Sequence, residues 1–365
     1  MATTKAKWFW AAAGAAVAAG AVLLLALAGR PGGAKGGPIL WEARGAGGVF
    51  AAGRTVAFGV RSSFALFGHT IGGVESSVLA LDAKTGAERW RFDKGVGVIA
   101  CGENVVCVIS ADAFLYNVDT DTGEELSRYS FYDYLGFPVI VDGRTVYIVS
   151  SSGLTAVDAD TGAAKWTLDV PAAPQHNVVF ENTTVFFASL DQNLYALDAE
   201  TGNEKWRFAM GNAAAPQLAS AGGMIIFQDH RDGLKGIDAE TGVERWRMPG
   251  RAAPRSGFAS DGNAVYYVGT DNALSAIDAG SGREKWRLDL PEDVGGGPLL
   301  KDGMLYLESP TKGLFGVSAR TGQETWGVAL SDTIVSDFAL ADGVLIFSDP
   351  DGYVYAVDAQ GSKEK

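Results

Sequence analysis

Residues 194–208 read LYALDAETGNEKWRF, and close copies of this stretch recur along the chain. The copies are VLALDAKTGAERWRF from Val78, LTAVDADTGAAKWTL from Leu154, LKGIDAETGVERWRM from Leu234 and LSAIDAGSGREKWRL from Leu274. The tryptophans of the later copies are spaced by 40 residues, at positions 166, 206, 246, 286 and 326. A repeat of this length indicates a stacked or circular array of similar units.

Each unit has the composition of short β-strands. Between residues 178 and 208, alternating β-branched and aromatic residues are separated by the turn clusters ENTT, DQN and AETG. No run keeps an amphipathic helical period over ten residues. Four antiparallel strands per unit predict an all-β fold, a β-propeller.

The number of Asp-x-x-Thr-Gly turns gives the number of blades. It begins at Asp82, Asp119, Asp158, Asp198, Asp238 and Asp278, Ser318 takes the Asp place once, and Asp358 begins an eighth copy. The Trp position of the unit is filled by Trp90, Ser127, Trp166, Trp206, Trp246, Trp286 and Trp326, and the eighth copy ends before it. Trp41, in ILWEARG, stands alone at the start of the array. We therefore expect residues 39–44 to complete a blade whose other strands lie at roughly 334–358, closing a ring of eight four-stranded blades without a free edge.

The repeated residues have structural explanations. Asp bonds its own backbone ahead in a turn, and Gly accepts the left-handed conformation that the turn needs. The repeated Trp residues are expected to fill the gaps between adjacent blades. Calcium binding by the repeated Asp residues is the less favoured interpretation, because one Asp per blade at a fixed turn is explained by geometry.

The N-terminal segment has the features of a membrane signal. Between Lys7 and Arg30 lie 22 uncharged residues, which as a helix would span about 33 Å, one hydrocarbon core. We expect residues 1–30 to be an uncleaved anchor, because the run is longer than the apolar part of a cleaved signal. A small-x-small site before Gly29 leaves cleavage open, and balanced flanking charges leave the orientation open. Residues 31–38 are expected to form a Gly- and Pro-rich tether, 39–361 the propeller and 362–365 a solvated tail.

The charge of the chain excludes one class of function. Lys and Arg number 30 against 43 Asp and Glu, a net charge of −13. Four of the basic residues precede Glu42, the first acidic one, so the chain from residue 39 onward carries −17. Such a body repels phosphate backbones, which argues against nucleic-acid binding. Two cysteines make no disulfide scaffold, and the chain has no C-x-x-C or H-E-x-x-H motif.

The unit L-x-A-x-D-x-x-T-G-x-x-x-W resembles the pyrroloquinoline-quinone (PQQ)-like propeller repeat, over roughly residues 39–361. The resemblance implies an eight-bladed propeller and leaves two branches. One is the quinoprotein dehydrogenases, which hold the quinone and Ca²⁺ over the axis. The other is the non-catalytic branch typified by the outer-membrane assembly factor BamB, which binds partner proteins at the envelope.

The dehydrogenase branch implies adjacent cysteines beneath the quinone and long insertions that roof the site. Here Cys101 and Cys107 are six apart, and most blades are close to 40 residues long. The BamB branch implies a lipid-anchored Cys, which the N-terminal segment lacks, and this departure concerns the anchor rather than the propeller. Because the features of the dehydrogenase branch are missing, we expect a BamB-like scaffold without enzymatic activity, and neither PQQ nor calcium as cofactor.

The repeat pattern fails in two neighbouring blades. About 13 extra residues lie in SSFALFGHTIGG (62–73), between the second and third strands of blade one. In blade two Ser127 replaces Trp and is followed by RYSFYDYLGFP (128–138). Both segments belong on one face, where they predict an apolar, partner-binding patch of Phe64, Leu66, Phe67, Ile71, Tyr132, Tyr134 and Phe137. The alternative is that the long hairpin folds over blade two and covers the defect left by the missing Trp.

The same face carries the mouth of the propeller axis. The innermost strands are preceded by APQH (173–176), APQL (215–218), APRS (253–256) and GGPL (296–299). Gln175, Gln217 and Arg255 are therefore expected near the axis, where two amides and a guanidinium suit a carbonyl, carboxylate or sugar. The more ordinary interpretation is a set of polar residues that solvate a water-filled channel.

These observations predict a membrane-tethered, extracytoplasmic propeller that binds envelope proteins and does no chemistry. The localisation is the periplasm or cell surface, or secretion if the signal is cleaved. The main alternative is a propeller that binds a quinone or another small ligand, as a sensor or a PQQ-dependent dehydrogenase. A third is a purely structural envelope protein.

Overall fold

The computed structural model describes residues 39–358 with short interruptions. These interruptions are 45–48, 53–54, 63–64, 67–68, 71–74, 95–96, 103, 111, 113, 131–138, 151–152, 171–173, 212–216, 230–232, 251, 291–293, 295, 329–338 and 349–352. The described residues form strands and turns and contain no helix. They therefore contain no helix able to cross a membrane. The predicted anchor and tether at 1–38 and the tail at 362–365 lie outside the described residues.

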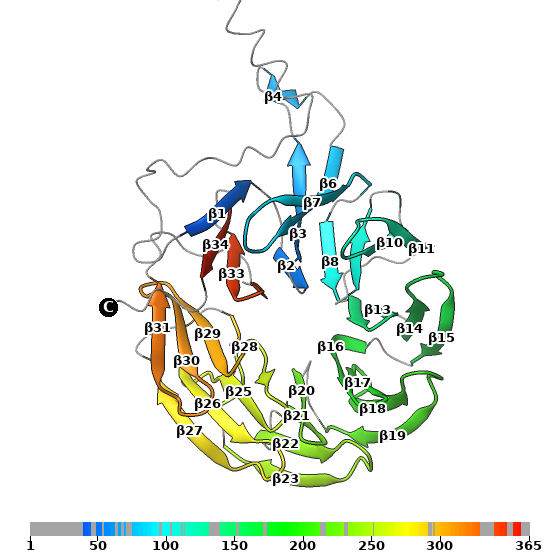
Figure 1. Cartoon of the computed structure of the whole chain (residues 1–365). Helices are drawn as coiled ribbons and strands as arrows, with labels where there is room; N and C mark the ends of the chain where they lie inside the picture. Colours follow the sequence, from blue (N-terminus) through cyan, green and yellow to red (C-terminus); the bar gives the residue numbers. More distant parts are fainter. Residues whose placement is uncertain are drawn as a thin grey trace, which may run out of the picture.

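Eight four-stranded antiparallel sheets surround a common axis as the blades of a propeller (Figure 1). Blade one contains β2 (Val49–Ala52), β3 (Thr55–Ser62), β6 (Glu75–Asp82) and β7 (Glu88–Phe92). Blade two contains β8 (Gly97–Cys101), β9 (Val105–Ile109), β10 (Phe114–Asp119) and β11 (Glu125–Ser130). Blade three contains β12 (Val139–Asp142), β13 (Thr145–Val149), β14 (Gly153–Asp158) and β15 (Ala164–Asp169). Blade four contains β16 (Pro174–Glu181), β17 (Thr184–Ser189), β18 (Asn193–Asp198) and β19 (Glu204–Ala209).

The remaining blades repeat this arrangement. Blade five contains β20 (Leu218–Ala221), β21 (Met224–Asp229), β22 (Gly233–Asp238) and β23 (Glu244–Met248). Blade six contains β24 (Ala259–Ser260), β25 (Ala264–Val268), β26 (Ala273–Asp278) and β27 (Glu284–Asp289). Blade seven contains β28 (Leu299–Lys301), β29 (Met304–Ser309), β30 (Gly313–Ser318) and β31 (Glu324–Val328). Blade eight contains β32 (Ala339–Ala341), β33 (Val344–Ser348), β34 (Tyr353–Asp358) and β1 (Ile39–Arg44). The prediction of an eight-bladed, all-β propeller is confirmed.

The ring is closed by its first strand. β1 pairs antiparallel with β34, and Trp41 lies opposite Ala356. The innermost strand of blade one, β2, contacts β32 of blade eight on one side and β8 of blade two on the other. Blade eight therefore consists of the strands that the sequence predicts, with residues 39–44 as its outermost strand. The ring is closed, so every blade has a neighbour on both sides.

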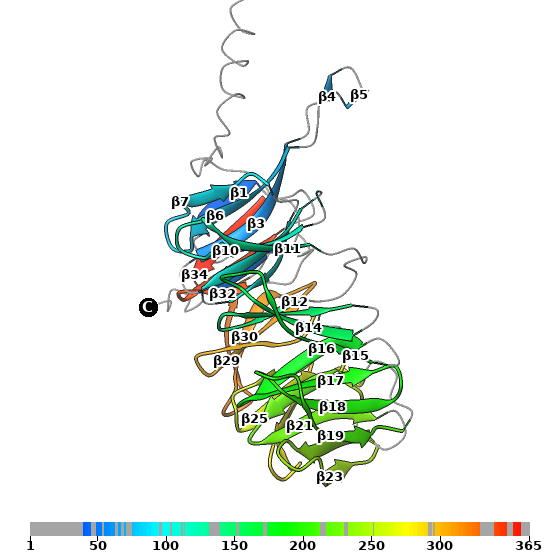
Figure 2. The same cartoon turned by 90° about the vertical axis from the view of Figure 1, so that its right-hand side faces the viewer.

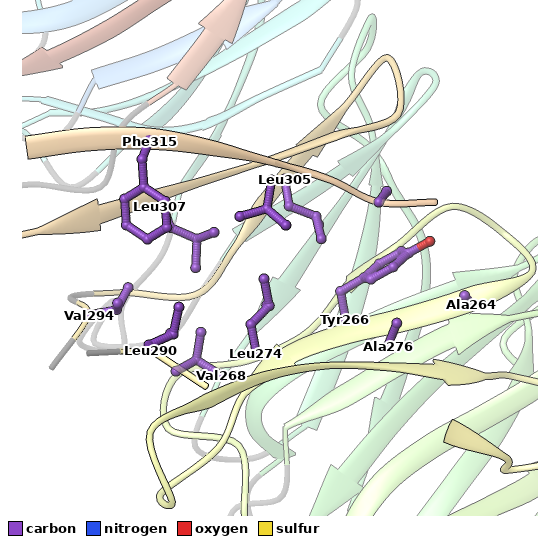
Figure 3. Close-up of a cluster of buried hydrophobic side chains, with 12 residues drawn as sticks. Ala264, Tyr266, Val268, Leu274, Ala276, Leu290, Val294, Leu305, Leu307 and Phe315 are labelled. Carbon is purple, nitrogen blue, oxygen red and sulfur yellow. The ribbon is translucent and has the colours of Figure 1, made fainter. Parts of the chain in front are cut away.

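The hydrophobic core lies between the blades. In the described residues the buried side chains form eight clusters, each shared by two neighbouring blades. Figure 3 shows the cluster between blades six and seven, where Tyr266 and Leu274 of blade six meet Leu305 and Phe315 of blade seven. Strands that pack against both neighbouring blades are buried on both faces of their sheet. Their sequences are therefore continuous apolar runs, such as AVYYV (264–268) in β25.

Candidate functional site

The repeated turn between the third and fourth strands is held by its Asp. In blade five, Asp238 Oδ1 accepts hydrogen bonds from the Thr241 amide at 2.9 Å and the Thr241 hydroxyl at 2.7 Å. The Gly242 amide donates to the Asp238 carbonyl at 2.9 Å. The same Asp-to-Thr or Asp-to-Ser bonds occur at Asp82, Asp119, Asp158, Asp198 and Asp278.

The hydrogen bonds of these turns lower the pKa values of their Asp side chains. Hydrogen bonds from the Thr241 side chain and the Arg245 guanidinium lower the pKa of Asp238 to about 2. The Thr201 side chain likewise lowers the pKa of Asp198. Each of these carboxylates therefore accepts the hydrogen bonds of its own turn, which explains the repeated Asp without a metal ion. Among the described residues, no three His, Cys, Asp or Glu side chains gather where they could share a metal ion.

The repeated Trp lies between its own blade and the next. A Cβ on Gly236, opposite Trp246 in the sheet, would meet the indole at 2.2 Å, and one on Gly282 of blade six would meet it at 2.6 Å. The indole N–H of Trp246 donates to the Ala279 carbonyl of blade six at 2.8 Å. The same donation to the next blade is made by Trp90, Trp166, Trp206 and Trp286. Trp326 packs against the ring of Tyr306, and the side chain of Trp41 lies outside the described residues.

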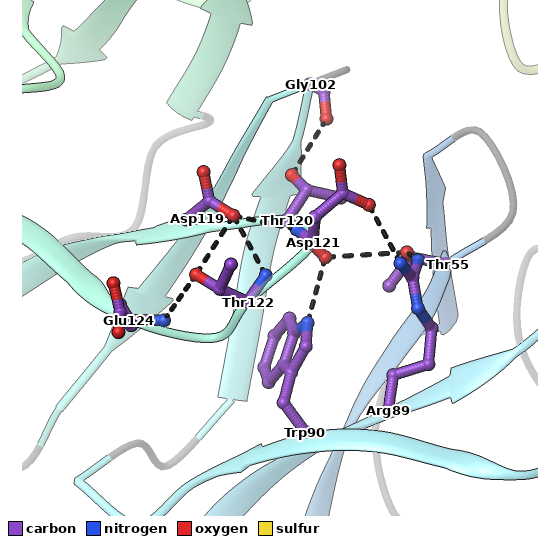
Figure 4. Close-up of polar contacts among 9 residues, drawn as sticks. All are labelled: Thr55, Arg89, Trp90, Gly102, Asp119, Thr120, Asp121, Thr122 and Glu124. Atoms are coloured by element: carbon purple, nitrogen blue, oxygen red, sulfur yellow. Dashed lines mark hydrogen bonds and ion pairs between the residues drawn. The ribbon is translucent and has the colours of Figure 1, made fainter.

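The seam between blades one and two carries additional polar contacts (Figure 4). The Thr120 carbonyl accepts the Trp90 indole N–H at 2.8 Å and the Thr55 hydroxyl at 3.4 Å. Arg89 donates to the Thr55 hydroxyl and forms an ion pair with Asp121 at 2.8 Å. The Trp contact and these polar contacts together join blade one to blade two.

The seam between blades two and three uses a different pair of residues. Ser127, at the Trp position, donates its hydroxyl hydrogen to the Ala159 carbonyl of blade three at 2.6 Å. Asn117 lies opposite Ser127 in the sheet, where most other blades have Ala or Gly, and its Nδ2 donates to Ser127 Oγ at 3.0 Å. Cys107 Sγ lies 3.5 Å from Asn117 Oδ1. The missing indole is therefore compensated inside the seam by Asn117 and Ser127.

Sequence reasoning identified Ser127 but missed Asn117 and one buried ion pair. Asn117 could have been recognised from the sequence, because it stands where the L-x-A-x-D pattern has a small residue. Lys235 Nζ lies 2.8 Å from Asp229 Oδ2, with side chains 7% and 3% exposed. Lys235 has a weaker signal, since neighbouring units carry Tyr195 or Ser275 at its position.

The insertion in blade one extends the hairpin of the second and third strands. β3 and β6 pair along their whole lengths, from Thr55 opposite Asp82 to Ser62 opposite Glu75. Farther along the insertion, β4 (Ala65–Leu66) pairs with β5 (His69–Thr70). Figure 2 shows β4 and β5 standing away from the body of the propeller, and Figure 1 shows β4 there as well. We call residues 59–77 the blade-one arm.

The predicted partner-binding residues fall at this arm and after β11. Phe64, Phe67, Ile71, Tyr132, Tyr134 and Phe137 lie outside the described residues, and Leu66 is described only through its backbone in β4. β11 ends at Ser130, directly before the second predicted segment. The two segments therefore leave neighbouring blades, and their side chains stay a prediction.

At the axis, the starts of successive innermost strands lie side by side. A Cβ on Gly257 of blade six would lie 3.7 Å from Gln217 Oε1 of blade five, and one on Gly297 of blade seven would lie 3.5 Å from Ser256 Oγ. Gln217 is half-buried and Arg255 is exposed. The Gln175 side chain lies outside the described residues, so its place at the mouth stays a prediction.

One protein-family model covers most of this architecture. The model described as outer membrane protein assembly factor BamB matches residues 74–178, 151–255 and 233–365. The chain belongs to the BamB family. No curated protein sequence matches it.

Solved structures resemble this BamB-family propeller at low sequence identity. BamB from Moraxella catarrhalis is 15% identical, with a TM-score of 0.59 over 85% of this chain and 99% of that one. The computationally designed Ika8 protein is 15% identical, with a TM-score of 0.67 over 93% and 100%. A europium-containing methanol dehydrogenase is 14% identical, with a TM-score of 0.58 over 87% and 84%. A designed protein and an enzyme match alike, so the likeness shows the fold alone.

The cysteines of this BamB-family chain are not opposed in the sheet. Cys107 pairs with Ala100, whereas Cys101 pairs with Val106. Successive residues of a strand point to opposite faces of the sheet. The Cys107 side chain is buried within the seam of blades two and three, where its Sγ lies near Asn117 Oδ1.

Proposed function

We propose that this BamB-family chain is a non-catalytic, membrane-tethered scaffold that binds protein partners on the extracytoplasmic side of the cell envelope. The observation that carries the proposal is the blade-one arm, a paired hairpin that stands away from an otherwise regular ring (Figure 2). Regular blades are explained by folding alone, whereas the described strands β4 and β5 of this hairpin stand away from the ring (Figure 2). Conspicuous departures from a consistent pattern occur preferentially at functional sites.

The binding surface in this proposal is the face from which the arm projects. Phe64, Leu66, Phe67 and Ile71 of the arm and Tyr132, Tyr134 and Phe137 after β11 supply the apolar and aromatic contacts. Aromatic residues dominate binding energy at protein interfaces, because they bury a large area at a small loss of conformational entropy. The segment at residues 1–30 holds the propeller at the membrane, and 31–38 give it reach. PQQ and Ca²⁺ have no role in the proposal.

The test is crosslinking and affinity capture of the full-length protein from membranes of its native host, with partners identified by mass spectrometry. Phe67→Asp and Tyr134→Asp should each abolish capture of a stoichiometric envelope protein. Leu190→Asp and Val243→Asp are matched controls, since both place the same charge at exposed apolar positions, 60% and 53% exposed. Leu190 lies in a turn between second and third strands, on the face of the arm, and Val243 in a turn on the opposite face.

Both controls should retain capture, and thermal unfolding of all four variants should stay near that of the unmodified protein. Loss of capture that follows unfolding would instead support a covering role for the arm. If no reproducible partner is captured, the scaffold proposal fails.

A second candidate function is binding of a small acidic or carbonyl ligand at the axial mouth. It is favoured by the exposed Arg255 and by Gln217, whose amide lies against the start of the next innermost strand. A guanidinium with neighbouring amides recognises a carboxylate through charge-assisted hydrogen bonds. Screening by calorimetry should find a ligand whose binding Arg255→Ala removes, and binding that survives this change would exclude the site. Calcium-dependent uptake of PQQ with a shifted absorption band would favour a dehydrogenase instead.

A further inference from the structure

Among the seams whose Trp position is described, the one between blades two and three is filled without an indole. A Trp side chain belongs to the buried cluster of each of the others. Between blades two and three the cluster is mostly aliphatic, and its aromatic member is the half-buried Tyr129. A buried aromatic side chain removes roughly 150–250 Å² of surface from water. This seam therefore lacks the largest apolar contact that its neighbours share.

Polar contacts take the place of the indole in this seam. Ser127 donates its hydroxyl hydrogen to the Ala159 carbonyl at 2.6 Å, and Asn117 Nδ2 donates to Ser127 Oγ at 3.0 Å. When two blades separate, such groups exchange their hydrogen bonds for bonds to water, so little free energy is lost. An indole that leaves a seam exposes apolar surface, for which water offers no replacement contact. Because regions with few buried apolar contacts open most readily, opening costs least at this seam.

Blade one is joined to blade two much more firmly. Besides the Trp90 contact and the Arg89 ion pair shown in Figure 4, Lys94 Nζ of blade one lies 2.8 Å from Glu125 Oε2 of blade two. Phe92 of blade one also packs edge-on against Tyr116 of blade two, with ring centroids 5.4 Å apart. We therefore expect the two blades to move as one unit, which carries the blade-one arm.

The innermost strands provide a hinge for such a movement. β8 of blade two contacts β12 of blade three, and a Cβ on Gly102 would meet Val141 Cγ1 at 2.6 Å. Farther out, the turn of blade three lies directly on the backbone of β11, where a Cβ on Gly162 would meet the Arg128 carbonyl oxygen at 2.6 Å. A rotation about β8 and β12 would lift this turn off β11 without unpairing any strand within a blade.

We propose that the propeller opens reversibly at the seam between blades two and three, so that blades one and two swing away from blade three. Asn117 and Ser127 form the latch, because their hydrogen bonds to each other and to blade three hold the outer part of the seam. The pairing of β1 with β34 keeps blade one attached to blade eight, so the open form is an arc of eight folded blades. Opening moves the arm relative to blade three, whether or not the arm binds a partner.

Cys107 can report the opening, because its thiol is buried in this seam beside Asn117. In a Cys101→Ser background, alkylation of Cys107 by iodoacetamide requires the seam to open, and mass spectrometry measures the rate. The matched control carries Cys101→Ser, Cys107→Ala and Ile226→Cys. Ile226 is buried between blades five and six and lies opposite Gly236 in the sheet, as Cys107 lies opposite Asn117.

We expect Cys107 to react at least roughly tenfold faster than the thiol introduced by Ile226→Cys. Its rate should also rise less steeply with urea, because opening one seam exposes less surface than global unfolding. Free space left by Ile226→Cys would speed the control, so the comparison is biased against the proposal. Equal rates with equally steep urea dependence would overturn it, because the seam would then open only when the whole protein unfolds.

Exchanging the residues of two seams tests the latch itself. Asn117→Ala with Ser127→Trp recreates the usual pair of a small residue and an indole, and should slow Cys107 alkylation at least roughly tenfold. Gly236→Asn with Trp246→Ser places the polar pair between blades five and six. There it should speed alkylation of the thiol introduced by Ile226→Cys to a similar degree, with a shallow urea dependence.

Thermal unfolding verifies that each exchanged protein is folded. If one of the two fails to fold, the other still decides, because each predicts a change of rate in the opposite direction. Alkylation rates that do not change in a folded exchanged protein would overturn the proposal, because the polar pair would then have no influence on the opening of its seam.

Discussion

Asn117 Nδ2 donates a hydrogen bond to Ser127 Oγ at 3.0 Å, and both residues are buried between blades two and three. At the corresponding seam of blades five and six, the same two positions hold Gly236 and Trp246. Ser127 keeps the hydrogen bond to the next blade that the indole makes elsewhere. A polar pair has thus replaced a small residue and an indole while preserving the link between blades.

A double-mutant cycle at this pair should show strong coupling. Ser127→Trp alone should destabilise the protein by roughly 1–3 kcal/mol, because Asn117 occupies the space that an indole needs. Adding Asn117→Ala should recover at least about 1 kcal/mol, since it recreates the pairing of Ala with Trp. Gly162 already stands where neighbouring blades place the turn glycine against the indole. Urea unfolding of the four proteins measures the coupling, and additive effects would contradict it.

Gly282→Ala should destabilise the protein more than Gly303→Ala. Both residues have positive φ, 69° and 77°, so an added Cβ costs about 1 kcal/mol of backbone strain at either one. At Gly282 the Cβ would also meet the Trp246 ring at 2.6 Å, whereas at Gly303 nothing lies within 4 Å. We expect an additional cost of roughly 1–3 kcal/mol at Gly282 from overpacking. Equal unfolding free energies in urea would show that the indole moves aside freely.

Acid should remove the stabilisation that the turn carboxylates provide. The folded pKa of Asp238 is about 2, below the ~3.9 of an unstructured Asp, so its contribution is complete above about pH 5 and is lost as the pH falls towards 2. Solvent screening limits it to about 1 kcal/mol. Asp238→Asn should therefore be less stable than the unmodified protein at pH 7 and converge with it near pH 2. A difference that stays constant between pH 7 and pH 2.5 in urea unfolding would contradict this linkage.

Removal of the closing strand should damage the ring, whereas removal of the preceding segment should not. A chain lacking residues 1–38 keeps β1 and should unfold as the whole propeller does. A chain lacking residues 1–44 loses the ladder from Ile39 opposite Val357 to Arg44 opposite Tyr353. We expect a loss of roughly 1–5 kcal/mol and aggregation through the bared β34 edge. Differential scanning calorimetry with light scattering compares the two, and identical transitions would show that closure contributes nothing.

Most of the fold could be predicted because the same residue types recur at the same positions of nearly every blade. The Asp and Gly of the turn and the Trp of the seam recur with a fixed spacing, and each has a local physical role that the structure shows. The lone Trp41 predicted the closing strand because a blade with three strands in the C-terminal part needs a fourth.

The site was less predictable, because its residues are those that leave the pattern. Ser127 could be recognised as a missing Trp, but its compensation by Asn117 depends on which residue lies opposite it in the sheet. The pairing of β4 with β5 and the length of the β3–β6 ribbon likewise depend on strand register, which a single apolar loop sequence does not specify. The side chains of the predicted aromatic patch therefore stay predictions.

The pairing of β1 with β34 sets an order of events for the newly made chain. The strand at residues 39–44 leaves the ribosome first among the strands, yet its partner at residues 353–358 leaves last. Blades one to seven can assemble in sequence as they are synthesised, but the ring cannot close until residues 353–358 have been made. Until then the strand at residues 39–44 is an uncommitted edge. The step that protects this edge from wrong partners is therefore the synthesis of β34, more than 300 residues later.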